Sequence, residues 1–164
     1  FCDTRFGNNN PYCLDTPTSW LDWSLLEKNK DIFNFVKYMI AFRHKHRVIR
    51  KDLDISHCKF PFVSQHGTSP WDDNFTDQSK IVCTMFAGYD STIEKDDIVY
   101  LAVNPYWESM HIQLPQLHNG LMWYLAVDTA DYAAGKFYYE ESEMHMPGNI
   151  FLLGARSVAV FIAK

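Results

Sequence analysis

The chain carries two patterns of hydrophobic and polar positions, and the change between them falls near residue 50. Before that point, one segment has the three-and-four spacing of a helical face, formed by Ile32, Phe35, Val36, Met39, Ile40 and Arg43. Asp31 stands where the N-cap of this helix belongs, and the basic run at 43–47 suits its C-terminus. The pattern predicts an amphipathic helix, preceded by a shorter helix through Trp20, Leu21, Trp23, Leu25 and Leu26.

Beyond residue 55, the apolar positions form short runs of strand length, several of them alternating with period two. These runs are 60–63, 81–86, 98–104, 110–114, 122–127, 150–153 and 157–162. Glycine, proline and aspartate separate them at the spacing of an antiparallel sandwich. The nearly continuous run at 97–104 is expected of a strand covered on both faces. The fold class is therefore predicted to be mainly β.

Composition excludes several other classes of protein. The chain has 164 residues, 47% of them hydrophobic and 16% aromatic, which suits one globular domain or one domain with an appendage. Its 15 basic and 20 acidic residues give a net charge of −5, without a basic run strong enough to bind nucleic acid. No run approaches the length of a membrane helix, and no signal peptide is evident, so we expect a cytoplasmic protein without a membrane partner.

The titratable residues do not suggest a metal site or a nucleophile. Cys2, Cys13, Cys58 and Cys83 lack both zinc-site pairing and the density of a disulfide scaffold, so reduced thiols are expected. His44 and His46 lie two positions apart, which turns them to different helical faces, and both are expected in solvent. The acidic residues in turn-like stretches are also expected in solvent: Asp72, Asp73, Glu94, Asp96, Asp97, Glu140, Glu141 and Glu143. No nucleophile elbow or phosphate-binding loop is present, and no metal and no cofactor are expected.

One segment combines the groups that recognise sugars. Residues 6–15 bring together amides, a carboxylate and an aromatic ring, in Asn8, Asn9, Asn10, Tyr12 and Asp15. Such groups form hydrogen bonds with vicinal hydroxyls and stack on a pyranose face. An Asn-rich turn, with side chains that satisfy their own backbone, explains the same residues equally well.

The same segment also resembles a known family. GNNNPYCLDTPTSWLDWSLLE, at 7–27, closely resembles the GNNNAYCQD…SWLDW stretch of bacterial glycogen debranching enzymes and isoamylases, in glycoside hydrolase family thirteen. The likeness continues through the helix at 32–51 and through VSQHGTSPWDDNFTDQSKIVCTMFAG, at 63–88, which is similar to the family's "FHG…PDWS…S" segment. DDIVYLAVNPYWE and LMWYLAVDTA fit its C-terminal β-domain, so the resemblance covers essentially the whole chain.

The resemblance implies a fold and an activity for a longer parent. Residues 1–55 would be the terminal loop and last helix of a (β/α)8 barrel, and residues 56–164 a C-terminal antiparallel β-sandwich. The chain also lacks an initiator Met, as expected of a piece of a longer protein. The parent would hydrolyse α-1,6-glucosidic branch points in glycogen, starch or limit dextrin, with an Asp nucleophile and a Glu acid/base about 5 Å apart. The family places these carboxylates upstream of residue 1, so no catalytic residue is expected here and the fragment alone should be inactive.

What the resemblance carries over is substrate contact. By position, Asn8, Asn9, Asn10, Tyr12 and Asp15 resemble the family's loop after barrel strand eight, on the face where barrel active sites lie. Two positions depart from the family, Pro11 for Ala and Leu14 for Gln, and the second removes one amide that could contact sugar.

The implied partners are α-glucan and the missing catalytic barrel. Trp20, Leu21, Trp23 and the apolar helix face would pack against that barrel. In the isolated chain this face must cover the sandwich, remain exposed or cause self-association of the fragment.

Two other functions remain open. The sandwich could be a stand-alone α-glucan-binding module that uses exposed rings such as Trp71, Trp107 or Trp123, although Trp123 lies inside a strand and is expected to be buried. It could also be a purely structural or interaction domain. Tryptophans open to water on the sandwich would favour the binding module.

Overall fold

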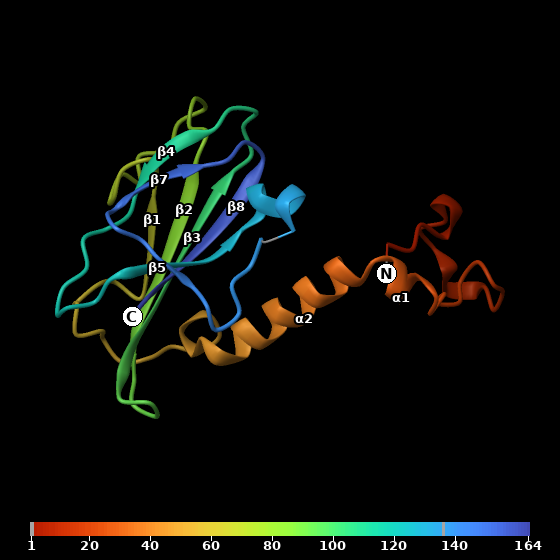
Figure 1. Ribbon diagram of the computed structural model, residues 1–164, viewed down its shortest axis with the longest axis horizontal. Helices are drawn as coiled ribbons and strands as arrows, with labels where there is room; N and C mark the ends of the chain where they lie inside the picture. Colours follow the sequence, from red (N-terminus) through yellow and green to blue (C-terminus); the bar gives the residue numbers. More distant parts are fainter. Residues whose placement is uncertain (1, 136) are drawn as a thin grey trace. The chain divides into compact units, whose positions relative to one another are not determined.

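The computed structural model describes residues 2–135 and 137–164, which form two compact units. The first unit ends at Phe42, and the second spans Arg43–Lys164. Figure 1 shows the ribbon of both units. The order of elements is η1 (Arg5–Gly7), η2 (Pro11–Cys13), α1 (Leu25–Lys28), α2 (Lys30–Lys45), η3 (Arg47–Ile49), β1 (Val63–His66), β2 (Val82–Asp90), β3 (Lys95–Asn104), β4 (Met110–Gln113), β5 (Trp123–Asp128), η4 (Thr129–Ala134), β6 (Met144–His145), β7 (Ile150–Leu153) and β8 (Ser157–Ala163).

The long helix is confirmed, and its first turn differs from the prediction. Asp31 lies inside the first turn of α2 rather than at the N-cap, where its carboxylate still complements the helix dipole. The shorter helix upstream is reduced to the four residues of α1. Asp22 explains this, because its carboxylate accepts the backbone N–H and the hydroxyl of Ser24, at 2.9 and 2.6 Å. Such local bonds compete with a helical turn.

The second unit is an antiparallel β-sandwich, as the sequence pattern predicts. Its larger sheet has six strands in the order β1-β2-β3-β8-β5-β6, and its smaller sheet pairs β4 with β7. Figure 1 shows the smaller sheet lying against the larger one. Side chains from both sheets share one core, which includes Met85, Tyr100 and Phe161 from the larger sheet and Ile112 and Leu153 from the smaller sheet.

Strand burial follows from the sequence pattern. Alternate residues of β2 are buried, with Cys83, Met85 and Ala87 on the core face. In β3 the run from Asp97 to Tyr100 is buried without a break, so both faces of this strand are covered, as expected from its continuous apolar sequence.

The first strand, β1, begins later in the chain than predicted. The run at 60–63 corresponds to β1 at Val63–His66. Pro61 has no N–H to give to a ladder, while Phe60 is buried in the core before the strand begins. The short strand β6 was not predicted, because both of its residues are exposed and leave no pattern.

Candidate functional site

The Asn-rich segment is exposed, and short hydrogen bonds organise it. Asn8 follows η1, and its side-chain oxygen accepts the backbone N–H of Asn10 at 2.9 Å. This is the turn that the sequence left as one explanation of these amides. Pro11 then starts η2, where its fixed φ suits a first helical position. Asn9, Asn10 and Tyr12 remain exposed, with 92% of Tyr12 open to solvent.

Asp15 belongs to a second arrangement in this unit. Its carboxylate accepts the indole N–H of Trp20 at 2.6 Å. Ser19 closes the same loop, because its hydroxyl contacts the carbonyl oxygens of Leu14 and Thr16. Among the described residues, no hydrogen bond joins Asn8, Asn9, Asn10 or Tyr12 to Asp15. The structure thus brings Asn8 and Asn10 together and ties Asp15 to Trp20, a pairing that the sequence pattern did not reveal.

The three tryptophans considered for sugar binding have different surroundings. Trp123 is 2% exposed and donates its indole N–H to the carbonyl of Pro115 at 2.8 Å, which confirms that it belongs to the core. Trp107 is 64% exposed and lies on Tyr106, with ring centroids 4.0 Å apart. Trp71 is 48% exposed. Two of the three rings are therefore open to water.

Trp71 borders a groove of about 560 Å³ at the edge of the larger sheet. The groove is lined by Pro61, Val63, Ser64, Gln65, Trp71 and Asp73. An aromatic ring, an amide, a hydroxyl and a carboxylate are thus collected around one hollow. The sequence suggests Trp71 as an exposed ring, but the polar residues beside it are brought together only by the fold.

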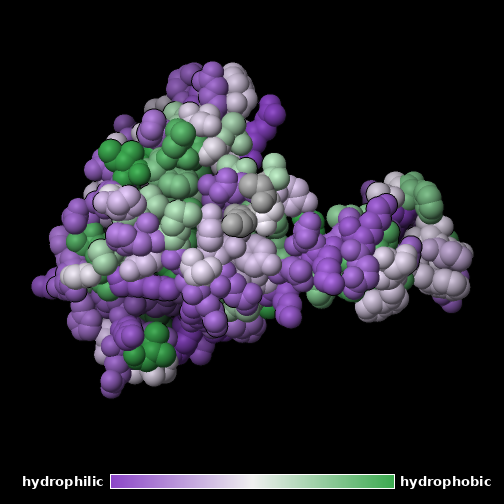
Figure 2. All heavy atoms as spheres, viewed as in Figure 1, coloured by the Kyte–Doolittle hydropathy of each residue, from purple (hydrophilic) through white to green (hydrophobic). Residues whose placement is uncertain are grey.

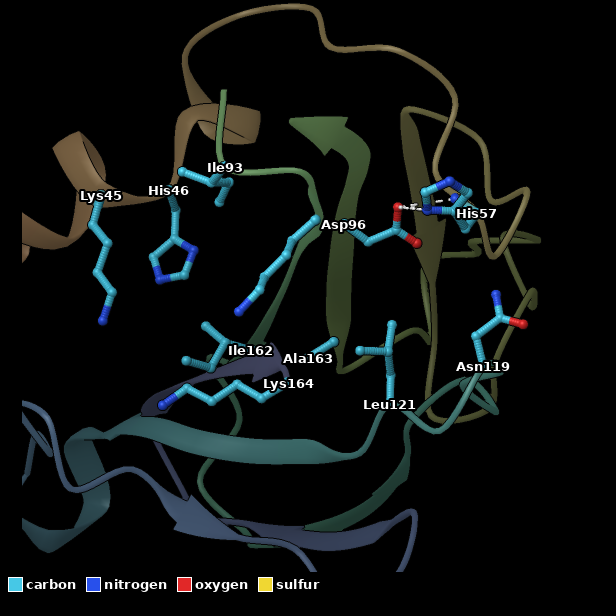
Figure 3. Close-up of a pocket in the computed structure, with 11 residues that line it drawn as sticks. Lys45, His46, His57, Ile93, Asp96, Asn119, Leu121, Ile162, Ala163 and Lys164 are labelled. Carbon is cyan, nitrogen blue, oxygen red and sulfur yellow. Dashed lines mark hydrogen bonds and ion pairs between the residues drawn. The ribbon is translucent and has the colours of Figure 1, made fainter. Parts of the chain in front are cut away.

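A second hollow, of about 870 Å³, lies in the same unit (Figure 3). Figure 3 shows Lys45 and His46 at one end and His57 and Asn119 at the other. Several of its charged groups have partners within the protein: Lys45 and Lys164 both contact Glu143, and His57 contacts Asp96 at 3.2 Å. The rest of its lining combines an apolar surface from Ile93, Leu121 and Ile162 with the side chains of Lys95 and Asn119.

Some of the charges expected in solvent are buried instead. His46 is 9% exposed, and its Nδ1 lies 2.7 Å from Asp97, which is itself 6% exposed. Asp96 and Glu143 each have a side chain only 4% exposed. The prediction was wrong for these four residues because the three carboxylates have donors that replace water and the ring of His46 has Asp97 as its partner. His44, Asp72, Asp73, Glu94, Glu140 and Glu141 are exposed as expected.

Burial and hydrogen bonds move several pKa values. Burial raises the pKa of the Cys83 thiol to about 11. The pKa of Asp90 is lowered, first by hydrogen bonds from Thr92 and also by Arg47. For Glu143, the hydrogen bond from Lys164 and the charge of Lys45 outweigh the effect of burial and lower the pKa. These carboxylates serve as ionised anchors, a role that requires no substrate.

Neither a metal centre nor a membrane span is found in the part of the chain that the structure describes. Within it, no three side chains of His, Cys, Asp or Glu are grouped to hold a metal ion. No helix there combines the length and hydropathy that crossing a membrane requires.

Comparison with known proteins identifies the sandwich. The family described as "Isoamylase, C-terminal" matches residues 62–162, from just before β1 to the penultimate residue of β8. The chain belongs to the isoamylase C-terminal family. The Asn-rich segment lies outside the matched residues, so family membership concerns the β-sandwich and its Trp71 groove.

Individual relatives extend the likeness into the first unit. An isoamylase of Pseudomonas amyloderamosa is 26% identical over 147 residues, which cover 90% of this chain and 18% of the relative. An isoamylase of Flavobacterium is 26% identical over 189 residues, covering 98% of this chain and 22% of the relative. A "Glycogen operon protein GlgX homolog" of Mycobacterium bovis is 46% identical over 48 residues, 29% of this chain and 7% of the relative. The chain therefore spans less than a quarter of the length of these isoamylase-family relatives.

Proposed function

We propose that this chain is the C-terminal portion of an isoamylase-like α-1,6-glucosidase that debranches glycogen, starch or limit dextrin. Residues 1–55 complete the catalytic barrel in this proposal, and residues 56–164 form the sandwich that stabilises it. The catalytic carboxylates come from the preceding part of the enzyme, so the chain alone does not hydrolyse glucan. The isoamylase names of relatives that align with most of the chain support this assignment.

The observation that carries the barrel-completing role of residues 1–55 is the apolar surface left uncovered in the first unit. Val36 and Ile40 of α2 are 49% and 56% exposed, and Leu21 is 40% exposed. Figure 2 shows apolar groups within the largely hydrophilic surface of this unit. Exposed apolar surface of this kind marks a protein interface. The catalytic barrel is the partner that the family architecture supplies.

The second part of the proposal is that Asn8, Asn9, Asn10, Tyr12 and Asp15 supply one loop of the substrate cleft. Asn9, Asn10 and Tyr12 are exposed and can form hydrogen bonds with sugar hydroxyls or stack on a ring. Asp15 and Asn8 would hold the loop in shape and would not bind sugar directly, because their side-chain oxygens already accept hydrogen bonds within the loop.

A nuclear magnetic resonance titration of the chain with a branched maltooligosaccharide tests the loop. We expect amide shifts in residues 8–15 and an unchanged set of anomeric signals, since this proposal places the catalytic carboxylates in the preceding part of the enzyme. Tyr12→Ala should reduce these shifts, while Tyr132→Ala, at an exposed tyrosine of the second unit, should not. Cleavage of the sugar by the chain, or an absence of shifts in 8–15, contradicts the proposed role of the loop.

The packing of residues 1–55 into the barrel is tested in an enzyme that contains this chain together with the rest of its barrel. Val36→Lys combined with Ile40→Lys should lower the thermal midpoint of that enzyme and its yield of active protein, because charges would be forced into the interface. An unchanged midpoint would show that this helix face does not contact the barrel.

We also propose a cytoplasmic location. All four cysteines are free in the described part of the chain, and Cys58 and Cys83 are buried as thiols. This state suits a reducing compartment.

A further inference from the structure

The groove beside Trp71 has the composition of a sugar-binding site, yet the cleft loop of the proposed enzyme lies in a different unit. We infer that this groove, formed by Trp71, Gln65, Ser64 and Asp73, is a second α-glucan-binding site on the sandwich. The inference rests on the proposed function for the choice of α-glucan as ligand. It assigns the groove a role in holding glucan that is separate from contact with the cleft.

The first observation is the way in which Trp71 is held. Its backbone lies in the left-handed region, at φ 65°, which is uncommon for a bulky side chain. Phe60 and His66 pack against the indole, with ring centroids 5.6 and 4.9 Å away. The chain thus maintains an unfavourable backbone conformation, and the result is a fixed ring that is 48% open to solvent. Conformations of this kind are found preferentially at functional sites.

The second observation is the hydrogen-bond chain behind the ring. The backbone N–H of Trp71 donates to Nδ1 of His66 at 2.7 Å, and Nε2 of His66 lies 2.9 Å from the hydroxyl oxygen of Ser64. His66 is completely buried, and burial lowers its pKa, which favours the neutral ring. Because Nδ1 accepts a hydrogen bond, the neutral ring carries its proton on Nε2 and donates it to Ser64.

This assignment fixes the polarity of the groove. With its oxygen accepting from His66, the Ser64 hydroxyl can donate its own hydrogen to a ligand oxygen. Gln65 and Asp73 are exposed and also line the groove: the amide of Gln65 can donate to and accept from sugar hydroxyls, and the carboxylate of Asp73 can accept from them. A volume of about 560 Å³ falls in the range of small-ligand sites. A glucose unit presents the matching surface, with an apolar ring face for the indole and hydroxyls at its rim.

The position of the groove suits a polymer. β1 is an edge strand of the larger sheet, and β2 is its only partner strand among the residues that the structure describes. A glucan chain can therefore enter and leave at this edge without threading through the protein.

Affinity electrophoresis of the chain in native gels containing glycogen tests this inference. We expect glycogen to slow the chain, maltoheptaose to reverse the effect, and hydroxyethylcellulose to have none. Trp71→Ala should weaken the affinity for glycogen by about tenfold or more, the effect of losing one good contact. Gln65→Ala changes an exposed residue and leaves the core intact, and it should weaken the affinity for glycogen by a smaller factor. Trp107→Ala is the matched control, because this exposed ring lies outside the groove, and it should bind like the wild type.

The other outcomes separate this inference from the proposed function. If the wild type is not slowed, or if Trp71→Ala and Gln65→Ala both keep full affinity, the groove does not bind glucan. If Tyr12→Ala abolishes binding while Trp71→Ala and Gln65→Ala do not, the groove is excluded and the cleft loop gains support. If Trp71→Ala and Gln65→Ala weaken binding while the longer enzyme fails to cleave α-1,6 branches, the groove stands and the proposed activity fails. Should Trp71→Ala unfold, as circular dichroism would show, the result with Gln65→Ala decides.

Discussion

At the scale of single residues, Asp97 shows how a charge in a polar stretch of sequence becomes part of the interior. One carboxylate oxygen lies 2.7 Å from Nδ1 of His46, and the other accepts the backbone N–H of Val48 at 3.0 Å. Val48 is 1% exposed, so its N–H has no access to water. Asp97 thereby fastens the segment after α2 to strand β3.

We expect Asp97→Ala to lower the free energy of unfolding by about 2–4 kcal/mol, because it leaves a buried N–H and a buried histidine without their acceptor. Urea denaturation followed by circular dichroism measures the change. Glu140→Ala, at an exposed carboxylate, is the control and should stay within about 0.5 kcal/mol of the wild type. Equal stabilities of the two variants would mean that Asp97 does not anchor this segment.

His66 should make stability depend on pH. Burial lowers its pKa in the folded protein, while the nearby Asp73 acts in the opposite direction and is the weaker influence. The unfolded chain therefore binds the proton more readily than the folded one. The stabilisation from neutral His66 is complete above the ordinary histidine pKa of about 6.5 and is lost as the pH falls toward the folded-state value.

The measurement is the free energy of unfolding in urea between pH 7.5 and 5.5, for the wild type and for His66→Ala. We expect the variant to be less stable by about 2–4 kcal/mol at pH 7.5, through a cavity and lost hydrogen bonds. The difference between the two proteins should shrink as the pH falls, since only the wild type carries this titration. Parallel curves would contradict the assignment of His66 as a neutral, buried ring.

The burial of some single residues could be predicted from the sequence, and the burial of others could not. Trp123 could be placed in the core because it lies in an apolar run, and the structure confirms it. Asp97 also carried a signal: it is two positions before Val99, on the same face of β3, and both are buried. That signal was too weak to be used, because a carboxylate at the start of a strand looks the same whether its partner is water or a histidine 51 residues away.

At the scale of elements, β2 and the preceding loop approach each other so closely that only glycine fits at position 88. A Cβ at this position would lie 2.7 Å from Cβ of Leu53 and 3.3 Å from the carbonyl oxygen of Asp54. The same loop is tied to β2, because the N–H of Tyr89 donates to the carbonyl of Asp54 at 2.8 Å. Space is therefore lacking for any side chain at residue 88.

Gly88→Ala should destabilise the protein by about 1–3 kcal/mol, the usual result of forcing an extra group into a packed site. Gly148→Ala provides the matched control, because its Cβ would meet no atom within 4 Å. That variant should be as stable as the wild type or slightly more so, since alanine restricts the unfolded chain. Thermal unfolding measures the stability of both variants. A similar loss of stability in both would show that the contact with Leu53 is unimportant.

Among residues 2–135 and 137–164, six strands could be predicted closely because each contains an apolar run of strand length, whereas β1, with Val63 as its one apolar residue, was expected three residues too early. Their order in the sheet could not be predicted, since the pairing of β3 with β8 joins residues more than fifty positions apart. β6 could not be found either, because two exposed residues leave no periodicity. At the candidate site, the loop residues were visible as a local cluster, whereas Gln65 and Ser64 become neighbours of Trp71 only through the fold.

At the scale of the whole molecule, the apolar face of α2 is only partly accounted for within the chain. The sequence predicts that Val36 and Ile40 belong to a packed face, yet 49% and 56% of these residues remain exposed, while Tyr38 and Phe42 are buried. An exposed apolar stripe costs free energy in water and favours any association that covers it. In the proposed enzyme, the barrel would cover it. In the isolated chain, a second copy is the available partner.

We therefore expect the chain to self-associate weakly, with a sedimentation coefficient that rises with protein concentration. Val36→Lys combined with Ile40→Lys should abolish the rise, because lysine keeps the helix while placing charge on the stripe. Ile55→Lys, at a residue that is 80% exposed and lies outside the helix, controls for the added charge and should associate like the wild type. If the wild type sediments as a strict monomer at high concentration, or if the control is as monomeric as the double variant, the stripe is not an association surface, and the barrel-docking role proposed for it loses its support.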